Sequence, residues 1–376
     1  RSPPFFMAPT IYCRGFFLYL CYMQIMKHTY NVLGVMSGTS VDGIDLCYCS
    51  FTIDKVWSYK IIKCKTIVYD AYWVNKLSQA ISLSKSKIPI LNNEYTSYLA
   101  LVINHFIEKN KITEIDFISS HGHTIFHKPE INFTFQLGNI YELRNLTNLP
   151  VVCDFRIQDL KLNGQGAPLV PIGDLFLFKD YDYCINLGGF SNVSLKSNKE
   201  IIAYDVCPVN IVLNKYSRKI GFEFDRNGSI SRSGKINEKL LTDLNNISFY
   251  SKKHPKSLGI EWVNKYIFPL IDSYNLSVPD ILRTFTEHIL IQLSKIIIDK
   301  NASILFTGGG VKNDFLFSLI KKKLPNIIVK PSDNLIDFKE ALIFGFLGVL
   351  RIRNEVNCLK SVTGAIKNHS SGVIFE

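Results

Sequence analysis

Two stretches of the chain share one pattern: an apolar strand, a turn of small residues, and a second apolar strand. In the first stretch, apolar segments over 31–36 and 44–51 frame a turn rich in Gly, Ser and Thr. In the second, residues 183–195 repeat this order around Gly188 and Gly189. The pattern predicts two β-hairpins. Because the copies lie roughly one domain length apart, it also predicts two similarly built lobes.

Between and after the hairpins, strand-like and helix-like periods alternate, which is typical of an α/β fold. No low-complexity linker separates the lobes, and we place them at 27–178 and 179–376, with the final helix (338–353) free to pack back on the first lobe. Short buried strands are predicted over 115–120, 134–138, 151–153, 201–204 and 303–307, and helices over 91–109, 283–299 and 337–353.

The first residues differ from the rest of the chain. The apolar run Phe16–Met23 is far shorter than the roughly 20 residues that span a bilayer. No small-residue cleavage site follows it, and the chain begins with Arg1. We therefore predict that residues 1–26 are an extension outside the fold; a targeting peptide is the alternative.

Composition narrows the function classes. A chain of 376 residues with 47% hydrophobic residues can form two globular domains. The net charge of +11 would suit a polyanion, but the lysines are scattered and the longest run is Lys321–Lys323. Without a binding motif, we predict no nucleic-acid partner, and no membrane partner. Nine cysteines without paired metal-type spacing indicate reduced thiols and a cytoplasmic protein.

The turn of the first hairpin has the composition of an anion site. Its small side chains leave backbone N–H groups and hydroxyls within reach of a phosphate. Beside the turn, Asp42 and Asp45 are suited to a divalent cation, directly or through water, as phosphate chemistry requires. The alternative is a plain surface hairpin.

Polar residues follow other predicted strands, where ligands commonly bind in α/β sheets. His121 and His123 come after strand 115–120; we expect hydrogen-bonding roles near a sugar, with structural histidines as the alternative. Arg156, after strand 151–153, suits a carboxylate or phosphate through paired N–H bonds. A structural ion pair with an aspartate is the alternative.

Carboxylates and glycines complete the set of candidates. Asp205 follows strand 201–204, and Pro208 suits the first turn of the next helix, so Asp205 is either a general base in the cleft or a helix N-cap. Three glycines at 308–310 form a strand-to-helix turn that an adenosine ring can approach closely. Glu340 is expected in the first turn of the last helix, or pointing into the cleft.

Together these segments resemble the anhydro-N-acetylmuramic acid kinase family of the actin and sugar kinase superfamily. The resemblance covers the chain from about Val32 to its end, and it implies a two-lobed actin-like ATPase (ribonuclease H-like) fold, with a duplicated mixed β-sheet, flanking helices and a central cleft. The matching segments are 36–43, 120–124, 135–139, 154–156, 164–171, 186–192 and 307–310.

The family uses ATP and water to convert 1,6-anhydro-N-acetylmuramic acid to N-acetylmuramic acid 6-phosphate and ADP in cell-wall recycling. By resemblance, Asp205 is the general base and Glu340 a carboxylate that holds the sugar and the water. The resemblance also implies Mg²⁺, with Asp42 as a ligand, and a homodimer. It implies ATP binding by Ser37, Gly38, Thr39, Ser40, Val41, Asp42, Gly43, Asp45, Gly188, Gly189, Gly308, Gly309, Gly310 and Asn313, and substrate binding by Arg156, His121, Gly122, Gln165 and Asn210.

Four positions depart from the family pattern. Cys207 and Val209 replace two glycines after the base, His123 replaces a glutamine, and Asn163 replaces a glycine. Lost glycines remove backbone freedom and add bulk near the sugar. The alternatives are therefore a related sugar kinase with another acceptor, or a non-catalytic nucleotide-binding homologue.

Overall fold

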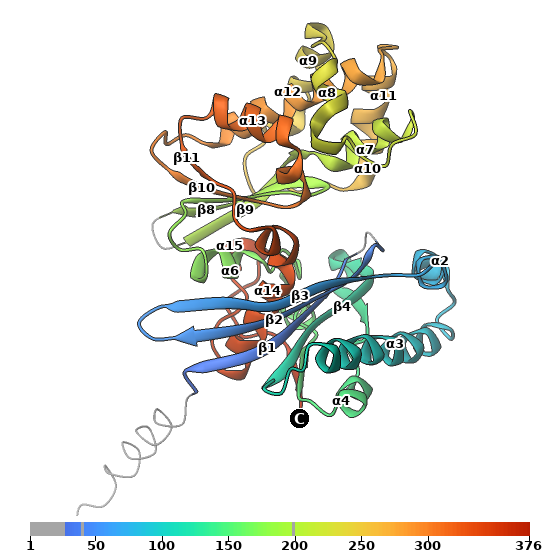
Figure 1. Cartoon of the computed structure of the whole chain (residues 1–376), viewed down its shortest axis with the longest axis vertical. Helices are drawn as coiled ribbons and strands as arrows, with labels where there is room; N and C mark the ends of the chain where they lie inside the picture. Colours follow the sequence, from blue (N-terminus) through green and yellow to red (C-terminus); the bar gives the residue numbers. More distant parts are fainter. Residues whose placement is uncertain (1–26, 39–40, 198–199) are drawn as a thin grey trace, which may run out of the picture.

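The computed structural model describes residues 27–38, 41–197 and 200–376, which form two β-sheets with flanking helices (Figure 1). The predicted extension, 1–26, lies outside the described residues. The first sheet contains β1 (Thr29–Ser37), β2 (Gly43–Ile53), β3 (Trp57–Val68), β4 (Phe117–Lys128), β5 (Phe133–Leu137), β6 (Val151–Cys153) and β12 (Val373–Phe375). The second contains β7 (Tyr183–Leu187), β8 (Phe190–Ser197), β9 (Glu200–Pro208), β10 (Ser303–Thr307) and β11 (Ile327–Val329).

Both sheets follow one topology. In the first, β1, β2 and β3 form an antiparallel meander, and β4 and β6 continue the sheet parallel to β1. In the second, β7, β8 and β9 form the meander, and β10 and β11 continue parallel to β7. The repeated order confirms the predicted duplicated mixed sheet.

Alternate residues of β1 face two different hydrophobic cores, as the period of a strand requires. Leu33 and Val35 pack with α3 (Ile88–Lys109) on one face. Val32 packs on the other face with α14 (Asp333–Ile352), whose cluster also includes residues of the second sheet. Helix α14 therefore lies between the two sheets, and the chain then returns to the first sheet, where β12 pairs with β6 (Figure 1).

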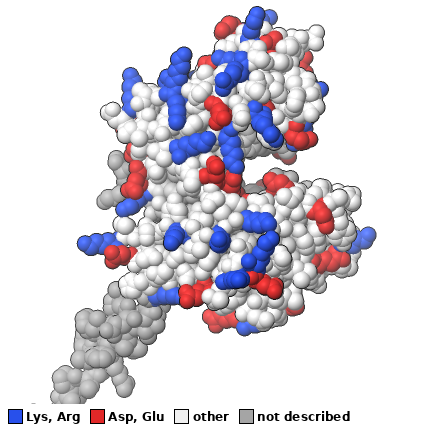
Figure 2. Space-filling model, in the orientation of Figure 1, with Lys and Arg blue, Asp and Glu red and all other residues white. Residues whose placement is uncertain are grey.

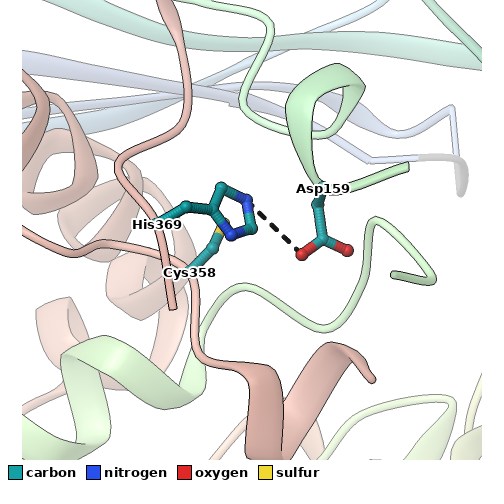
Figure 3. A group of neighbouring side chains, drawn as sticks. All are labelled: Asp159, Cys358 and His369. Carbon is teal, nitrogen blue, oxygen red and sulfur yellow. Dashed lines mark ion pairs between the residues drawn. The ribbon is translucent and has the colours of Figure 1, made fainter. Parts of the chain in front are cut away.

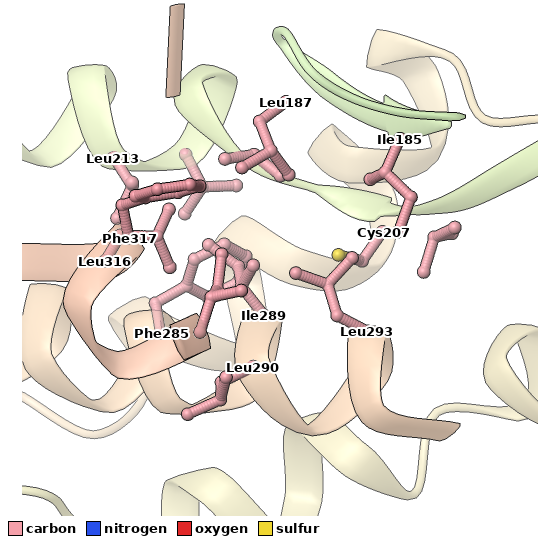
Figure 4. Packing of buried hydrophobic residues seen from close by; sticks show 14 of the residues in the cluster. Ile185, Leu187, Cys207, Leu213, Phe285, Ile289, Leu290, Leu293, Leu316 and Phe317 are labelled. Carbon is pink, nitrogen blue, oxygen red and sulfur yellow. The ribbon is translucent and has the colours of Figure 1, made fainter. Parts of the chain in front are cut away.

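The core of the second lobe forms between its sheet and α7 (Asn210–Arg218), α12 (Val278–Ile296) and α13 (Asp314–Lys323). Phe285, Ile289 and Leu293 of α12 belong to one cluster with Ile185 and Leu187 of β7 (Figure 4). The remaining α-helices are α2 (Ala71–Gln79), α4 (Tyr141–Thr147), α5 (Ile157–Lys161), α6 (Pro171–Phe176), α8 (Ser229–Ser233), α9 (Glu238–Asn245), α10 (Ile260–Trp262), α11 (Phe268–Asp272) and α15 (Lys360–Thr363).

Three helices begin earlier than the sequence pattern predicts, and the first of them, α3, begins at Ile88 rather than at 91. Helix α12 begins at Val278, because the side chain of Ser277 caps it by accepting the backbone N–H of Asp280. Helix α14 begins at Asp333, after the cap Ser332. Glu340 therefore lies in the second turn, and the prediction that it occupies the first turn is wrong.

Two strands run further than predicted. Strand β4 continues to Lys128 because β5 pairs with its second half, so His121 and His123 lie within the strand rather than after it. Strand β9 continues to Pro208, which pairs with Phe190 of β8. Asp205 thus lies inside β9, and the placement of Pro208 in the first turn of a helix is wrong.

The surface shows no single basic face in the view of Figure 2. Lysine and arginine side chains are spread over both lobes among acidic ones, and a notch separates the lobes on one side. In the part of the chain that the structure describes, no helix combines the length and apolar character needed to cross a membrane.

Candidate active site

The first hairpin brings Ser37 and Gly43 to either side of its turn. Ser37 is buried and its hydroxyl forms 2.8 Å hydrogen bonds with Tyr69 Oη and His123 Nδ1, so it lies behind the turn. A Cβ at Gly43 would lie 2.6 Å from the carbonyl oxygen of Ile67, so this position requires glycine. Gly38 and Val41 lie in the turn, where Val41 N–H donates to Gly38 O at 3.3 Å, whereas Thr39 and Ser40 lie outside the described residues.

Four carboxylates gather beside this turn. Burial raises the pKa of Asp45 to about 6, against a lowering effect of the hydrogen bond from Thr66 (2.5 Å). The negative charges of Asp42, Glu340 and Asp337 raise this pKa further. The first hairpin and α14 therefore face a common space, where neighbouring carboxylates carry negative charge that a cation would offset.

The second hairpin and the glycine turn after β10 also come together. The side-chain amide of Asn210 donates to Leu187 O (3.1 Å) and Gly188 O (2.8 Å) and so holds the second hairpin beside Gly189. Gly308 has φ +83°, and a Cβ there would lie 2.4 Å from Asn186 Oδ1. A Cβ at Gly310 would similarly meet Leu187, and one at Gly309 would come within 4.0 Å of Asn210 Nδ2.

These glycines are joined to α14 by an ion pair. Lys312, directly after the glycine turn, lies 2.6 Å from Asp337, whose charge also acts on Asp45. The first hairpin and the glycine turn of the second lobe therefore approach the same end of α14. Asn313, which was expected to bind ATP, caps α13 by accepting the N–H of Leu316 at 3.0 Å.

Arg156 is held by a neutral histidine. Its Nε and Nη2 atoms lie 3.0 Å and 2.8 Å from His121 Nε2, and its Nη1 donates to Gly166 O at 2.7 Å. His121 Nδ1 lies 2.8 Å from Gly122 O, so the ring donates from Nδ1 and accepts at Nε2. Gly122 has φ +73°, which favours glycine, and a Cβ there would lie 2.6 Å from Leu137 O.

The surroundings keep His121 neutral and Arg156 charged. Burial lowers the pKa of His121 well below its usual value, and the charge of Arg156 lowers it further. Burial lowers the pKa of Arg156 to about 10, which leaves the guanidinium protonated at neutral pH. Within the described residues no carboxylate lies within ion-pair distance of Arg156, so the alternative of a structural ion pair with aspartate is wrong.

Glu340 lies on α14 near this guanidinium. Its side chain is exposed to solvent. Partial desolvation by the surrounding protein raises its pKa, and the charges of Arg156 and Lys339 lower it. A carboxylate whose pKa is shifted by burial and by specific neighbouring charges is a candidate functional group.

Asp205 is fixed within β9. Its Oδ2 accepts the N–H of Leu258 at 2.7 Å, and its own N–H donates to Lys256 O at 3.1 Å. Burial raises its pKa, and the hydrogen bond from Leu258 partly opposes this. The alternative reading as a helix N-cap is wrong, because Val209 occupies the N-cap position of α7.

The remaining candidates divide between the site and the scaffold. Gln165 has an exposed side chain, and its N–H donates to Thr363 O at 2.8 Å. Burial lowers the pKa of His123 to about 4, and this ring binds Ser37, which supports the structural alternative. Sequence reasoning missed the hydroxyl of Tyr95, which forms a 2.7 Å hydrogen bond with that of Tyr69 behind the first hairpin, because neither spacing nor motif marks it.

The duplicated sheets, the three glycine-lined turns and the charged groups at α14 define an ATP-dependent sugar kinase of the actin-like ATPase class. The family model described as "Anhydro-N-acetylmuramic acid kinase" matches residues 30–376. The chain therefore belongs to the anhydro-N-acetylmuramic acid kinase family, as the resemblance predicted.

Curated relatives match over nearly their whole length. The anhydro-N-acetylmuramic acid kinase of Sulfurovum sp. is 32% identical over 365 residues, which cover 91% of this chain and 98% of the relative. That of Haemophilus influenzae is 33% identical over 382 residues, which cover 93% and 98%.

Solved structures resemble the chain more distantly. The activator of the 2-hydroxyisocaproyl-CoA dehydratase from Clostridium difficile, with bound ADPNP, has a TM-score of 0.41 at 12% identity and covers 86% of this chain and 97% of its own. Hexokinase from Schistosoma mansoni, complexed with glucose, has a TM-score of 0.35 at 10% identity and covers 80% and 81%. Both TM-scores are below 0.5, so the fold assignment rests on the repeated strand order and the family match.

Proposed function

We propose that this protein opens the anhydro ring of 1,6-anhydro-N-acetylmuramic acid with water and phosphorylates O6 with ATP, giving N-acetylmuramic acid 6-phosphate and ADP. The observation that carries the proposal is the convergence on α14: the first hairpin, the glycine turn after β10 and Arg156 all interact with charges at 337–340. The reaction belongs to cell-wall recycling in the cytoplasm, and we propose that the protein can form a homodimer.

Asp205 is the general base in this proposal. It takes a proton from water as the water oxygen bonds to the anomeric carbon C1. The bond from C1 to the bridging oxygen then breaks, and that oxygen, O6, takes the γ-phosphoryl group of ATP. A carboxylate whose pKa is raised by burial accepts this proton more readily than an exposed one.

Arg156 and Glu340 bind the sugar. A protonated guanidinium with N–H groups to spare suits the lactate carboxylate of a muramic acid. Glu340 accepts hydrogen bonds from sugar hydroxyls and from the water. Of the other predicted substrate residues, Gln165 reaches the sugar through its exposed side chain. His121, Gly122 and Asn210 act indirectly: His121 holds Arg156, Gly122 holds His121, and Asn210 holds the second hairpin.

Backbone N–H groups of the two hairpins bind the ATP phosphates, and the glycines at 308–310 accept the adenosine. The carboxylates of Asp42 and Asp45 fit Mg²⁺, because their mutual repulsion is what a divalent cation relieves. The chemistry that Mg²⁺ supplies there is neutralisation of phosphate charge. We further propose that α14 and β12 belong with residues 27–178 as the first lobe.

Turnover in isotopically labelled water tests the proposal. Incubation with ATP, Mg²⁺ and the anhydro sugar in ¹⁸O-water should place the label on the C1 hydroxyl and the phosphate on O6, as read by mass spectrometry. Label elsewhere, or ATP consumption only with ordinary sugars, would contradict the reaction.

The Asp205→Asn variant tests the base. Turnover should fall by about 10²–10⁴-fold, since an amide does not accept the proton, while ATP affinity stays near that of the wild type. Asp54→Asn, on an exposed turn, is the matched control and should keep full activity. Retention of most activity by Asp205→Asn would show that the base lies elsewhere.

A further inference from the structure

A buried group of polar residues lies directly behind the loop that carries Arg156. Asp159 of α5 is fully buried, and Cys358 and His369, from the C-terminal segment 357–371, face it (Figure 3). Asp159 Oδ1 accepts the hydroxyl of Thr363 at 2.7 Å and lies 3.5 Å from His369 Nε2. The C-terminal segment thus supplies partners for a carboxylate that the proposed reaction does not use.

One residue joins this group to Arg156. The N–H of Gly166 donates to Asp159 Oδ2 at 2.7 Å, and the carbonyl of the same residue accepts Arg156 Nη1 at 2.7 Å. Gly164 tightens the turn, because its N–H donates to Asp159 O at 2.8 Å and a Cβ there would lie 2.1 Å from Asp159 Oδ2. A shift of the Asp159 carboxylate therefore moves Gly166, whose carbonyl oxygen orients the guanidinium of Arg156.

Helix α15 connects the same turn to the second lobe. Thr363 O accepts the N–H of Gln165 at 2.8 Å, and Ser361 Oγ donates to Ile201 O of β9 at 3.0 Å. Strand β9 carries Asp205. The C-terminal segment consequently spans the distance between the Arg156 turn and the strand of the proposed base.

We propose that Thr363 and Asp159 are positioning residues that orient Arg156 toward the sugar through Gly166. This rests on the proposed function, in which Arg156 binds the sugar. The hydroxyl of Thr363 holds one carboxylate oxygen so that the other stays aligned with Gly166 N–H. A hydrogen bond to a buried carboxylate is among the stronger kinds, because the charged acceptor has no water to replace it.

Asp159, Cys358 and His369 could also form a metal site. The candidate ligand atoms of Asp159, Cys358 and His369 lie within 4.8 Å of one another, and such a set suits Zn²⁺. Closed zinc sites have four ligands, however, and this group supplies three among the described residues. Both oxygens of Asp159 also accept hydrogen bonds already. We therefore favour the positioning role and make the metal an outcome of the test.

The test compares Thr363→Val, which removes the hydroxyl, with Thr363→Ser, which keeps it. Thr363→Val should raise the KM for the sugar about tenfold while kcat and the KM for ATP stay within about twofold, and Thr363→Ser should restore the wild-type KM. Changes of similar size in the KM for the sugar, the KM for ATP and kcat would overturn the proposal, and so would a failure of Thr363→Ser to restore the wild-type KM. If Thr363→Val does not fold, Thr363→Ala gives the same comparison.

A double-mutant cycle separates this proposal from the function on which it rests. Because Thr363 acts through Arg156, its substitution should change the sugar KM less than twofold in an Arg156→Lys background. An undiminished effect there would refute the positioning role. If Arg156→Lys alone leaves the sugar KM unchanged, the proposed role of Arg156 fails instead. Elemental analysis of the purified protein should find no stoichiometric zinc, and one zinc per chain would overturn the proposal.

Discussion

At the scale of single residues, the candidate site depends on charge states that neighbours impose. His121 binds Arg156 without competing for its charge, because burial and the guanidinium both lower the pKa of the imidazole. Asp45 shows the opposite effect, since burial and nearby carboxylates raise its pKa to about 6. Residue type and order along the chain predicted that these side chains would matter, but not which of them would be neutral.

The raised pKa of Asp45 predicts a pH-dependent gain in stability for Asp45→Asn. The folded pKa exceeds the unfolded value of about 3.9, so the stability linked to this group is present below that pH and lost as pH rises through about 6. Allowing for its partial exposure, we expect Asp45→Asn to raise the free energy of unfolding by about 1 kcal/mol at pH 8 and not at pH 4.

Urea denaturation at both pH values measures this difference. Asp54→Asn is the control, because Asp54 lies on an exposed turn and should show no such dependence. An equal gain for Asp45→Asn at pH 4 and pH 8 would contradict the assigned cause.

At the scale of elements, β1 and α14 approach more closely than side chains normally allow. A Cβ at Gly34 would lie 2.0 Å from the carbonyl oxygen of Ala341, which is backbone and has little freedom to move. Gly345 on the helix lies opposite Gly34 in the same contact. The pair of glycines is what lets the helix reach the sheet.

Gly34→Ala should therefore lower the free energy of unfolding by about 3 kcal/mol, since the strand and the helix must separate to admit the methyl group. Gly259→Ala is a matched control: its nearest neighbour is the end of the flexible Glu261 side chain, so the change should be within about 0.5 kcal/mol. Denaturant unfolding compares the two variants. Similar losses in both would show that backbone flexibility, rather than crowding, determines the effect.

The elements that local pattern could define were predicted well. The strands at β6 and β10 have the predicted bounds, and both hairpins form where the small residues indicated. The errors in the strand bounds occur where pairing with a neighbouring strand along the chain lengthens a strand. Pairing with β5 extends β4 past His121, and pairing with β8 extends β9 to Pro208. Periodicity within one strand does not show how far its pairing with a neighbouring strand extends.

At the scale of the whole molecule, a buried ion pair anchors α14, the helix between the two sheets, to α6 of the first lobe. Lys339 Nζ lies 2.6 Å from Asp174 Oδ1 of α6, and both side chains are almost fully buried. Lys339 directly precedes Glu340, so the ion pair also holds the part of α14 that carries Glu340. Motif analysis did not find it, because nothing in the local sequence links the two positions.

Lys339→Met should lower the free energy of unfolding by about 3–5 kcal/mol, because it leaves the carboxylate of Asp174 buried without its cation. Lys339→Met combined with Asp174→Leu should recover most of this loss. The control is Lys312→Met, which breaks the exposed pair with Asp337 and should change stability by less than about 1 kcal/mol. Urea titrations of the three variants decide: no recovery in the double variant would mean that packing of the lysine stem is the larger contribution.

The return of the chain to its first sheet has a consequence for biosynthesis. Strand β12 (Val373–Phe375) pairs with β6 (Val151–Cys153), and α14 covers a face of the same sheet, whose other strands come far earlier in the chain. A nascent chain that has not yet reached α14 and β12 has neither element, so its first sheet keeps an uncovered apolar face until both are made. A truncation that removes α14 and β12 would thus disturb the half of the protein that is encoded first.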